Sequence, residues 1–144
     1  MKVAYTRRLS DHDVAEFGCV SVTATTLQRF VPKAFEVRLT VIGDQWFPIA
    51  IHAATESAHT DWRSEPSALT YEIVPVPDSV AGSVSKYLKV MKLVYAGLDF
   101  VVTPNAEEWV MLEANSGPQF GWLEAATGAP MVAAMADLLL KGSV

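Results

Sequence analysis

Residues 98–121 read LDFVVTPNAEEWVMLEANSGPQFG, and this stretch decides the fold that the sequence predicts. Apolar side chains dominate residues 98–103 and again residues 108–113, and Pro-Asn-Ala at 104–106 separates the two runs. Two short apolar runs on either side of a turn signal predict two antiparallel strands joined as a hairpin.

A hairpin centred on residue 106 fixes which side chains of the two strands lie opposite each other. Asp99 then pairs with Glu113, Val101 with Met111, and Thr103 with Trp109. The other face of the hairpin is wholly apolar, and we expect it to face the core. That face carries Phe100, Val102, Val110 and Leu112.

Two carboxylates opposite each other on neighbouring strands repel, and a divalent cation between them would remove that repulsion. Asn115 has the same parity as Glu113 and adds an amide oxygen to the face that carries Asp99. An all-oxygen set without His or Cys suits a hard cation such as Mg²⁺. The other interpretation, that the acidic pair at the hairpin end is only solvated, stays open on pattern alone.

Alternating or apolar runs predict strands through most of the first half of the chain. The clearest pair, at 35–42 and 45–53, flanks Gly43-Asp44, a two-residue turn. Residues 55–67 are polar and predict a loop. The remaining candidate strands are 3–8, 18–24, 27–31 and 69–76.

Two segments have helical spacing of their apolar residues, 79–94 and 130–140. We expect Asp78 to cap the first helix and Gly97 to mark the turn after it. The second helix begins with proline and is expected to bury Met131, Met135, Leu138 and Leu139. Strands with two helices packed against them predict an α+β fold with a mainly antiparallel sheet, in one domain spanning 1–144.

The composition disfavours several classes of function. The 144 residues are 51% apolar and 19% charged, with a formal net charge of −5, so a general electrostatic grip on nucleic acid or an anionic membrane is disfavoured. One cysteine, Cys19, forms no internal disulfide and fits a core position, and the start of the chain lacks a signal-peptide pattern. We therefore expect a soluble cytoplasmic protein.

The sequence gives little support for a zinc site, a serine hydrolase or a P-loop enzyme. His52, His59 and Asp61 match no standard zinc spacing. Neither a Gly-x-Ser-x-Gly elbow nor a Walker lysine motif occurs in the sequence, which disfavours hydrolase and P-loop interpretations.

Several short motifs, in order along nearly the whole chain, resemble the C-terminal half of the ATP-grasp ribosomal peptide maturases. That family is related to the microviridin-type macrocyclising ligases and to the ribosomal-protein glutamylating ligases. One departure is Ser-Gly-Pro-Gln at 116–119, where the family has proline followed by a Gly-Gln pair. The matching motifs are LQRFVPK at 27–33, EVRLTVIGD at 36–44, DWR at 61–63, GLD at 97–99, LEAN at 112–115 and QFGWLE at 119–124.

The resemblance implies a role for each matching residue. Arg38 and Arg63 would be catalytic contacts to phosphate or acyl-phosphate oxygens, and Lys33 would reach the ribose or the phosphates. The hinge segment that meets the adenine would be formed by Gln28, Phe30 and Val31. The Mg²⁺ ligands would be Asp99, Glu113 and Asn115.

The resemblance also implies a reaction. An ATP- and Mg²⁺-dependent ligase would convert a carboxylate of a ribosomally made precursor peptide into an acyl phosphate, which an amine or a hydroxyl captures. The glycine-rich half of the nucleotide clamp and the substrate domain are missing from the sequence, so we expect the isolated chain to lack full catalysis. Two alternatives are a non-catalytic nucleotide- or peptide-binding module and a plain interaction domain. The missing half would leave apolar surface exposed, so association of the chain into a homo-oligomer stays an open alternative.

Overall fold

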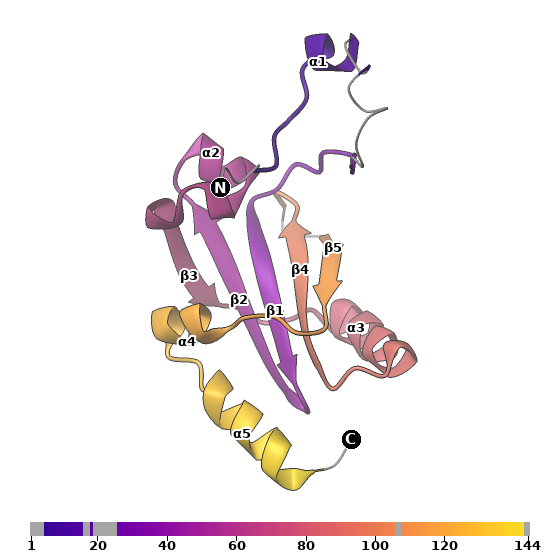
Figure 1. Ribbon diagram of the computed structural model, residues 1–144, viewed down its shortest axis with the longest axis vertical. Coiled ribbons are helices and arrows are strands. Elements are labelled where there is room, and N and C mark those ends of the chain that lie inside the picture. Colours follow the sequence, from indigo (N-terminus) through magenta and orange to yellow (C-terminus); the bar gives the residue numbers. More distant parts are fainter. Residues whose placement is uncertain (1–4, 16–17, 19–25, 106–107, 143–144) are drawn as a thin grey trace.

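A five-stranded antiparallel sheet forms the centre of the computed structural model, which describes residues 5–15, 18, 26–105 and 108–142 (Figure 1). The strands lie in the order β3-β2-β1-β4-β5, so β1 is central and β5 is an edge. Their bounds are β1 Phe35–Ile42, β2 Gln45–Ala53, β3 Leu69–Ile73, β4 Tyr95–Val102 and β5 Trp109–Asn115.

Helices cover both faces of this sheet. The helices are α1 Asp11–Ala15, α2 Glu56–Thr60, α3 Asp78–Met91, α4 Gly121–Thr127 and α5 Met131–Lys141, with 3₁₀ turns η2 Trp62–Ser64 and η3 Pro66–Ala68. This arrangement confirms the predicted α+β fold with its antiparallel sheet. Among the described residues, no helix is long and apolar enough to cross a membrane.

Alternation along β1 divides the core into two clusters, because successive side chains of a strand point to opposite faces. Val37, Leu39 and Val41 pack with Val84 and Leu88 of α3. On the other face, the end of β1 packs with α4 and α5 in a cluster of Ile42, Phe47, Ile49, Leu123, Ala129, Met131 and Ala134. The polar side chains of β1 lie on this second face.

The predicted β1–β2 hairpin is confirmed, with Ile42 paired to Gln45 across the turn. Gly43 has φ +58°, a left-handed conformation that glycine adopts without steric cost. The strand predicted over 69–76 ends at Ile73, because the prolines at 75 and 77 cannot donate hydrogen bonds to a ladder.

The predicted first helix is confirmed, but both of its ends differ from the prediction. Asp78 is the first helical residue, and Pro77 takes the N-cap position. The helix ends at Met91, and Lys92 takes the C-cap position; Lys92 is left-handed with φ 54°, and its backbone N–H bonds to carbonyls of the last turn. Gly97 lies inside β4, so its predicted place in a turn was wrong.

Gly97 is a glycine because the chain after β5 passes close to it. A Cβ atom at this position would lie 2.7 Å from Cβ of Pro118, well inside van der Waals contact. Pro118 is buried, so it cannot move aside without disturbing the loop between β5 and α4.

The helix predicted over 130–140 is confirmed as α5, with Pro130 at its N-cap. Met131 is buried and both Met135 and Leu138 are partly buried, as the spacing predicted. Leu139 is 73% exposed, so its predicted burial was wrong.

The β4–β5 hairpin keeps only part of the predicted register. Asp99 does lie opposite Glu113, but the pairing shifts between Asp99 and Phe100. One extra residue on β5, a β-bulge, therefore replaces the predicted partners by Phe100–Met111, Val101–Val110 and Val102–Trp109. Leu112 is 40% exposed, so the prediction that it faces the core was wrong.

The N-terminal predictions agree least with the structure. Residues 5–8 and 27–31 form no strand, and the described start of the chain contains α1 instead. Residues 3–4 and 19–24, including Cys19, lie outside the described residues. The predicted loop at 55–67 contains α2, η2 and η3, since Thr55 caps α2 by accepting a hydrogen bond from the backbone N–H of Ala58.

The close approach at Gly97 generates a stability prediction. We expect Gly97→Ala to lower the free energy of unfolding by about 1–3 kcal/mol, because the added methyl group overpacks against Pro118. Urea unfolding followed by circular dichroism measures this change.

The matched control is Gly82→Ala on α3, where a Cβ would meet nothing within 4 Å. That substitution is expected to raise stability by up to about 1 kcal/mol through helix propensity. Equal effects of the two substitutions would contradict the argument from close approach.

Candidate functional site

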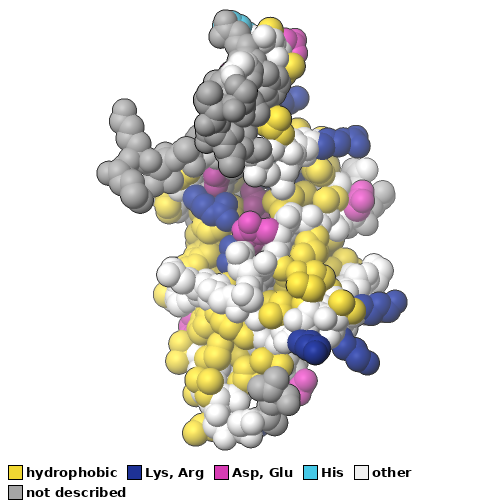
Figure 2. Space-filling model, turned by 45° about the vertical axis from the view of Figure 1, so that its right-hand side comes forward, with side chains coloured by type: hydrophobic (Ala, Val, Ile, Leu, Met, Phe, Trp, Pro, Cys, Tyr) yellow, Lys and Arg dark blue, Asp and Glu magenta, His cyan; other side chains and the backbone are white. Residues whose placement is uncertain are grey.

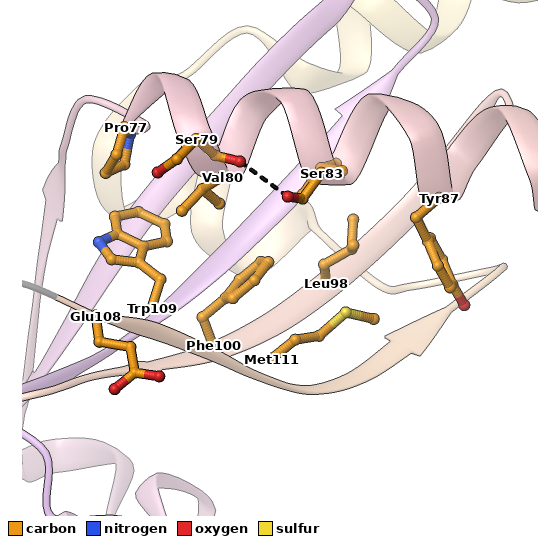
Figure 3. Close-up of a pocket in the computed structure, with 11 residues that line it drawn as sticks. Pro77, Ser79, Val80, Ser83, Tyr87, Leu98, Phe100, Glu108, Trp109 and Met111 are labelled. Carbon is orange, nitrogen blue, oxygen red and sulfur yellow. Dashed lines mark hydrogen bonds between the residues drawn. The ribbon is translucent and has the colours of Figure 1, made fainter.

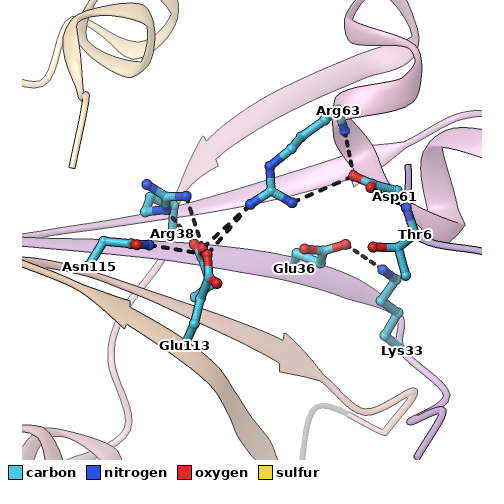
Figure 4. A network of polar contacts seen from close by, with 9 residues as sticks. Thr6, Lys33, Glu36, Arg38, Asp61, Arg63, Glu113 and Asn115 are labelled. Carbon is cyan, nitrogen blue, oxygen red and sulfur yellow. Dashed lines mark hydrogen bonds and ion pairs between the residues drawn. The ribbon is translucent and has the colours of Figure 1, made fainter. Parts of the chain in front are cut away.

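Three neighbouring strands present a row of charged side chains on the sheet face that α4 and α5 partly cover. Arg38 on β1 lies in register with Asp99 on β4, and Asp99 lies opposite Glu113 on β5 (Figure 4). Figure 2 shows acidic and basic side chains side by side near the centre of the molecule. Adjacent strand positions thus bring together residues that are up to 75 positions apart in the sequence.

Arg38 and Asp99 form a two-pronged ion pair. Nε of Arg38 donates to Oδ1 of Asp99, and Nη2 donates to Oδ2 at 2.9 Å. Both residues are buried, at 7% and 6% exposure. The planar guanidinium matches the two carboxylate oxygens, and this geometry fixes both side chains within the sheet.

Glu113 and Asn115 extend the row at the edge of the sheet. The Asn115 side-chain amide donates to Oε1 of Glu113 at 3.1 Å, and both residues leave β5 on the same face. The Glu113 side chain is about half exposed, so its carboxylate is accessible from solvent. The predicted grouping of Asp99, Glu113 and Asn115 on one face is therefore present in the fold.

Arg63 reaches this row from outside the sheet. Its Nη2 lies 3.6 Å from Oε1 of Glu113 and 4.0 Å from Oδ2 of Asp99. The guanidinium also lies 4.7 Å from the ring centroid of Trp62, a cation–π contact, and Trp62 stacks on Trp122. Because η2 begins at Trp62, a short loop turn rather than a strand carries this second arginine to the site.

Asp61 holds Arg63 in place, a role that the sequence analysis missed. Its Oδ1 accepts from the backbone N–H of Arg63 at 3.1 Å, and the same oxygen lies 3.6 Å from Nη1 of the side chain. Its Oδ2 accepts from the backbone N–H of Thr6 at 2.9 Å. The signal available in the sequence was an aspartate two residues before the arginine, a spacing typical of side-chain capping of a turn.

The two carboxylates of the site have unequal acidities. Burial raises the pKa of Asp99 to about 6; the Arg38 charge opposes this, and a hydrogen bond with Glu113 adds to it. Hydrogen bonds from Asn115 and from Asp99 lower the pKa of Glu113. As the pH falls, Asp99 therefore takes up a proton before Glu113 does. Such a difference in pKa is expected for two carboxylates at close range.

The predicted nucleotide residues have no hydrogen bond or ion pair with Arg38, Asp99 or Glu113 among the described residues. Phe30 and Val31 line a cavity of about 380 Å³ with Thr103 and Val110, whereas Gln28 is exposed and outside that lining. The Lys33 ammonium is paired with the Glu36 carboxylate. The roles predicted for these residues stay predictions.

Comparison with known proteins identifies the fold. No protein-family model matches the sequence, and no curated protein matches it. The macrocyclase MdnC of Microcystis aeruginosa MRC, solved with the precursor peptide MdnA, superposes with a TM-score of 0.82 at 28% identity over 98% of this chain. A Chryseobacterium gregarium RiPP-associated ATP-grasp ligase, solved with ADP and a leader and core peptide, gives 0.89 at 24% identity over 99% of the chain.

The ATP-grasp ligase PsnB, solved with a minimal precursor, gives a TM-score of 0.77 at 22% identity over 97% of the chain. The chain has the fold of part of an ATP-grasp peptide ligase. The predicted resemblance to ATP-grasp ribosomal peptide maturases is thereby confirmed. The match covers 44% of MdnC, 44% of the Chryseobacterium ligase and 45% of PsnB, so the chain spans less than half the length of these ATP-grasp ligases.

The unequal acidities at the site of this ATP-grasp fold generate a pH prediction. We expect Asp99 to titrate near pH 6 in the folded chain, and we expect Glu113→Gln to lower that pKa because it removes the neighbouring negative charge. Carbon-13 NMR of the aspartate carboxyl groups measures both values.

The sign of the stability effect follows from proton binding. Between about pH 4 and pH 6 the folded chain keeps a proton that the unfolded chain releases, so the contribution of Asp99 to stability falls as pH rises through this window. Glu56→Gln, at an exposed position of α2, is the control and should leave the Asp99 titration unchanged. An Asp99 pKa near 4 in the unaltered chain would contradict the prediction.

Proposed function

We propose that this chain supplies the Mg²⁺-nucleotide-binding and carboxylate-activating part of an ATP-dependent peptide ligase. The observation that carries the proposal is the convergence of two arginines, two carboxylates and an amide on one sheet face. The fold supports it, because the neighbours that share this fold include ligases solved with ADP and with precursor peptides.

The donor set of the site fits a magnesium ion. Asp99 and Glu113 lie opposite each other on neighbouring strands, and Asn115 adds an amide group beside Glu113. Carboxylate and amide oxygens are preferred ligands of hard divalent cations, and water and phosphate oxygens complete such sites. These three residues would hold Mg²⁺ by exchanging contacts that the two carboxylates make with Arg38 and Arg63 for contacts with the ion. When bound, Mg²⁺ would neutralise negative charge on the phosphates during transfer.

The two arginines have different tasks in this proposal. Arg38 uses Nε and Nη2 for Asp99, which leaves Nη1 as the donor available to a ligand oxygen. Arg63 is half exposed and lies over the edge of the row, so it is the arginine accessible to an incoming carboxylate. Both guanidinium groups would stabilise negative charge that develops on the transferring oxygens.

The reaction consistent with these groups has two steps. A carboxylate oxygen of a precursor peptide attacks the γ-phosphorus of ATP, which forms an acyl phosphate and releases ADP. An amine or a hydroxyl of the peptide then attacks the acyl carbon, loses its proton to solvent or a base, and releases inorganic phosphate. The products are an amide or an ester, ADP and phosphate.

The nucleotide would extend from the charged row toward the segment before β1. Phe30 and Val31 line a cavity there and supply apolar contacts for a base, with Gln28 in the same segment. Lys33 would bind ribose or phosphate only by exchanging its contact with Glu36 for one with the nucleotide. In this proposal the chain forms the C-terminal half of the clamp, so we expect ATP turnover by the isolated chain to be far below that of a complete ligase.

The metal ligands generate the decisive prediction. Isothermal titration calorimetry with the non-hydrolysable analogue AMPPNP should show binding that tightens when Mg²⁺ is added. Glu113→Gln should remove this tightening, because it deletes one anionic ligand and retains the size of the side chain. We expect at least a tenfold loss of affinity in the presence of Mg²⁺ and little change in its absence.

Glu56→Gln serves as the control, since Glu56 is exposed on α2 and outside the charged row. Circular dichroism and thermal unfolding check that each variant is folded. Nucleotide binding that ignores Mg²⁺ would favour the alternative of a non-catalytic nucleotide-binding module. Failure of the unaltered chain to bind AMPPNP at millimolar concentration would overturn the proposal.

A further inference from the structure

The two arginines of the charged row differ in how their guanidinium groups are held. Arg38 is buried and bound to Asp99 by two hydrogen bonds, whereas the Arg63 side chain is half exposed. The side-chain nitrogens of Arg63 approach the three neighbouring carboxylates only to 3.6–4.0 Å, which is too long for hydrogen bonds (Figure 4). Among the described residues, no hydrogen bond therefore fixes the direction of the Arg63 guanidinium.

The ring of Trp62 is the surface on which this guanidinium lies. The central carbon of the Arg63 guanidinium, Cζ, is 4.7 Å from the centroid of the Trp62 ring. A cation over the face of an indole is attracted by the negative charge of that face. Because η2 is only three residues long, the direction of the Trp62 ring depends on the side chains that pack against it.

Two further rings fix the position of Trp62. Trp122 of α4 stacks on Trp62, with ring centroids 5.1 Å apart and an angle of 23° between the planes. Tyr71 of β3 meets Trp122 edge-on, with centroids 5.5 Å apart. Both Tyr71 and Trp122 are partly buried against the core cluster that α4 and α5 share with the sheet. The aromatic stack therefore connects the Arg63 side chain to the core of the protein.

We propose that Trp62 and Trp122 are positioning residues that hold the Arg63 guanidinium beside the charged row, with Trp122 acting through Trp62. This inference rests on the proposed function, in which Arg63 stabilises charge on the transferring oxygens. A half-exposed arginine loses rotamers when it binds an anion, and this loss of entropy opposes binding. A guanidinium that the stack already holds has lost part of that freedom before the ligand arrives, so the stack should strengthen binding.

The first test observes Arg63 itself and needs no ligand. Proton–nitrogen NMR of arginine side chains resolves the Nε–H group, and the Trp62 ring should shift the Arg63 signal upfield from that of a free arginine. Trp122→Leu should remove most of this shift and lower the heteronuclear NOE of the Nε–H group, because Trp62 loses its stacking partner. Arg63→Lys lacks the signal and so assigns it.

Phenylalanine variants separate stacking from simple packing. Trp122→Phe keeps a flat ring against Trp62, so it should retain most of the upfield shift that Trp122→Leu loses. In a chain that carries Trp62→Leu, the further change Trp122→Leu should have no effect on the Arg63 signal, because Trp122 acts through Trp62. Equal effects of leucine and phenylalanine at position 122 would mean that the ring only fills space, and they would overturn the inference.

The second test is a double-substitution cycle on nucleotide binding. AMPPNP carries the γ-phosphoryl oxygens of the proposed transfer, and calorimetry measures its affinity in the presence of Mg²⁺. Trp122→Leu should weaken binding about two- to fivefold, the size of one exposed cation–π contact, and Arg63→Gln should weaken it more. In the Arg63→Gln chain, Trp122→Leu should cost nothing further, because no guanidinium remains to be held. Losses that simply multiply would overturn the inference.

Trp109→Leu is the matched control. Trp109 is also partly buried and pairs with an aromatic ring, Phe100, at a centroid distance of 5.6 Å. It lines a cavity of about 480 Å³ beside α3, on the sheet face opposite the charged row (Figure 3). The control should lower stability but leave the Arg63 signal and the nucleotide affinity unchanged. Circular dichroism and thermal unfolding check that each variant is folded.

The inference and the proposed function fail in different ways. If the unaltered chain binds no AMPPNP, the proposed function and its positioning residues fall together. If AMPPNP binds but Trp122→Leu changes neither the Arg63 signal nor the affinity, the positioning inference alone is overturned. An effect of Trp109→Leu as large as that of Trp122→Leu would also overturn it, because a general loss of packing would then explain both.

Discussion

The buried ion pair between Arg38 and Asp99 is the constraint on which the site depends. It joins the central strand β1 to its neighbour β4 through two hydrogen bonds inside the protein. A buried guanidinium without its carboxylate would be strongly unfavourable, so each residue requires the other. The pair also orients Nη1 of Arg38, and it places the carboxylate that Glu113 and Arg63 approach from the edge of the sheet.

A single extra residue in β5 allows the β4–β5 hairpin to contribute side chains to both the charged row and the cavity beside α3. Before the bulge, Trp109 and Met111 face α3, while after it Glu113 and Asn115 lie on the face of the charged row. A regular strand would have kept strict alternation and placed these side chains differently. The bulge thus separates the charged row from the apolar cavity beside α3, although both use the same two strands.

The likeness to ATP-grasp peptide ligases gives these surfaces a context. The chain superposes on less than half of each such ligase, and the charged row belongs to the part that it shares with them. In the proposed function, the arginines and carboxylates of the row would act by positioning and by neutralising charge on the transferring oxygens.

The sequence by itself determined the β1–β2 hairpin, the α3 and α5 helices and the opposition of Asp99 to Glu113, because local periodicity and turn residues encode these features. It also indicated the family through its ordered motifs. Tertiary structure alone decided the β-bulge beside Asp99, the close approach of Pro118 to Gly97 and the hydrogen bond from the Arg63 backbone to Asp61. These features depend on how each segment packs in the folded chain. The periodicity of a single segment does not say which other segments will pack against it.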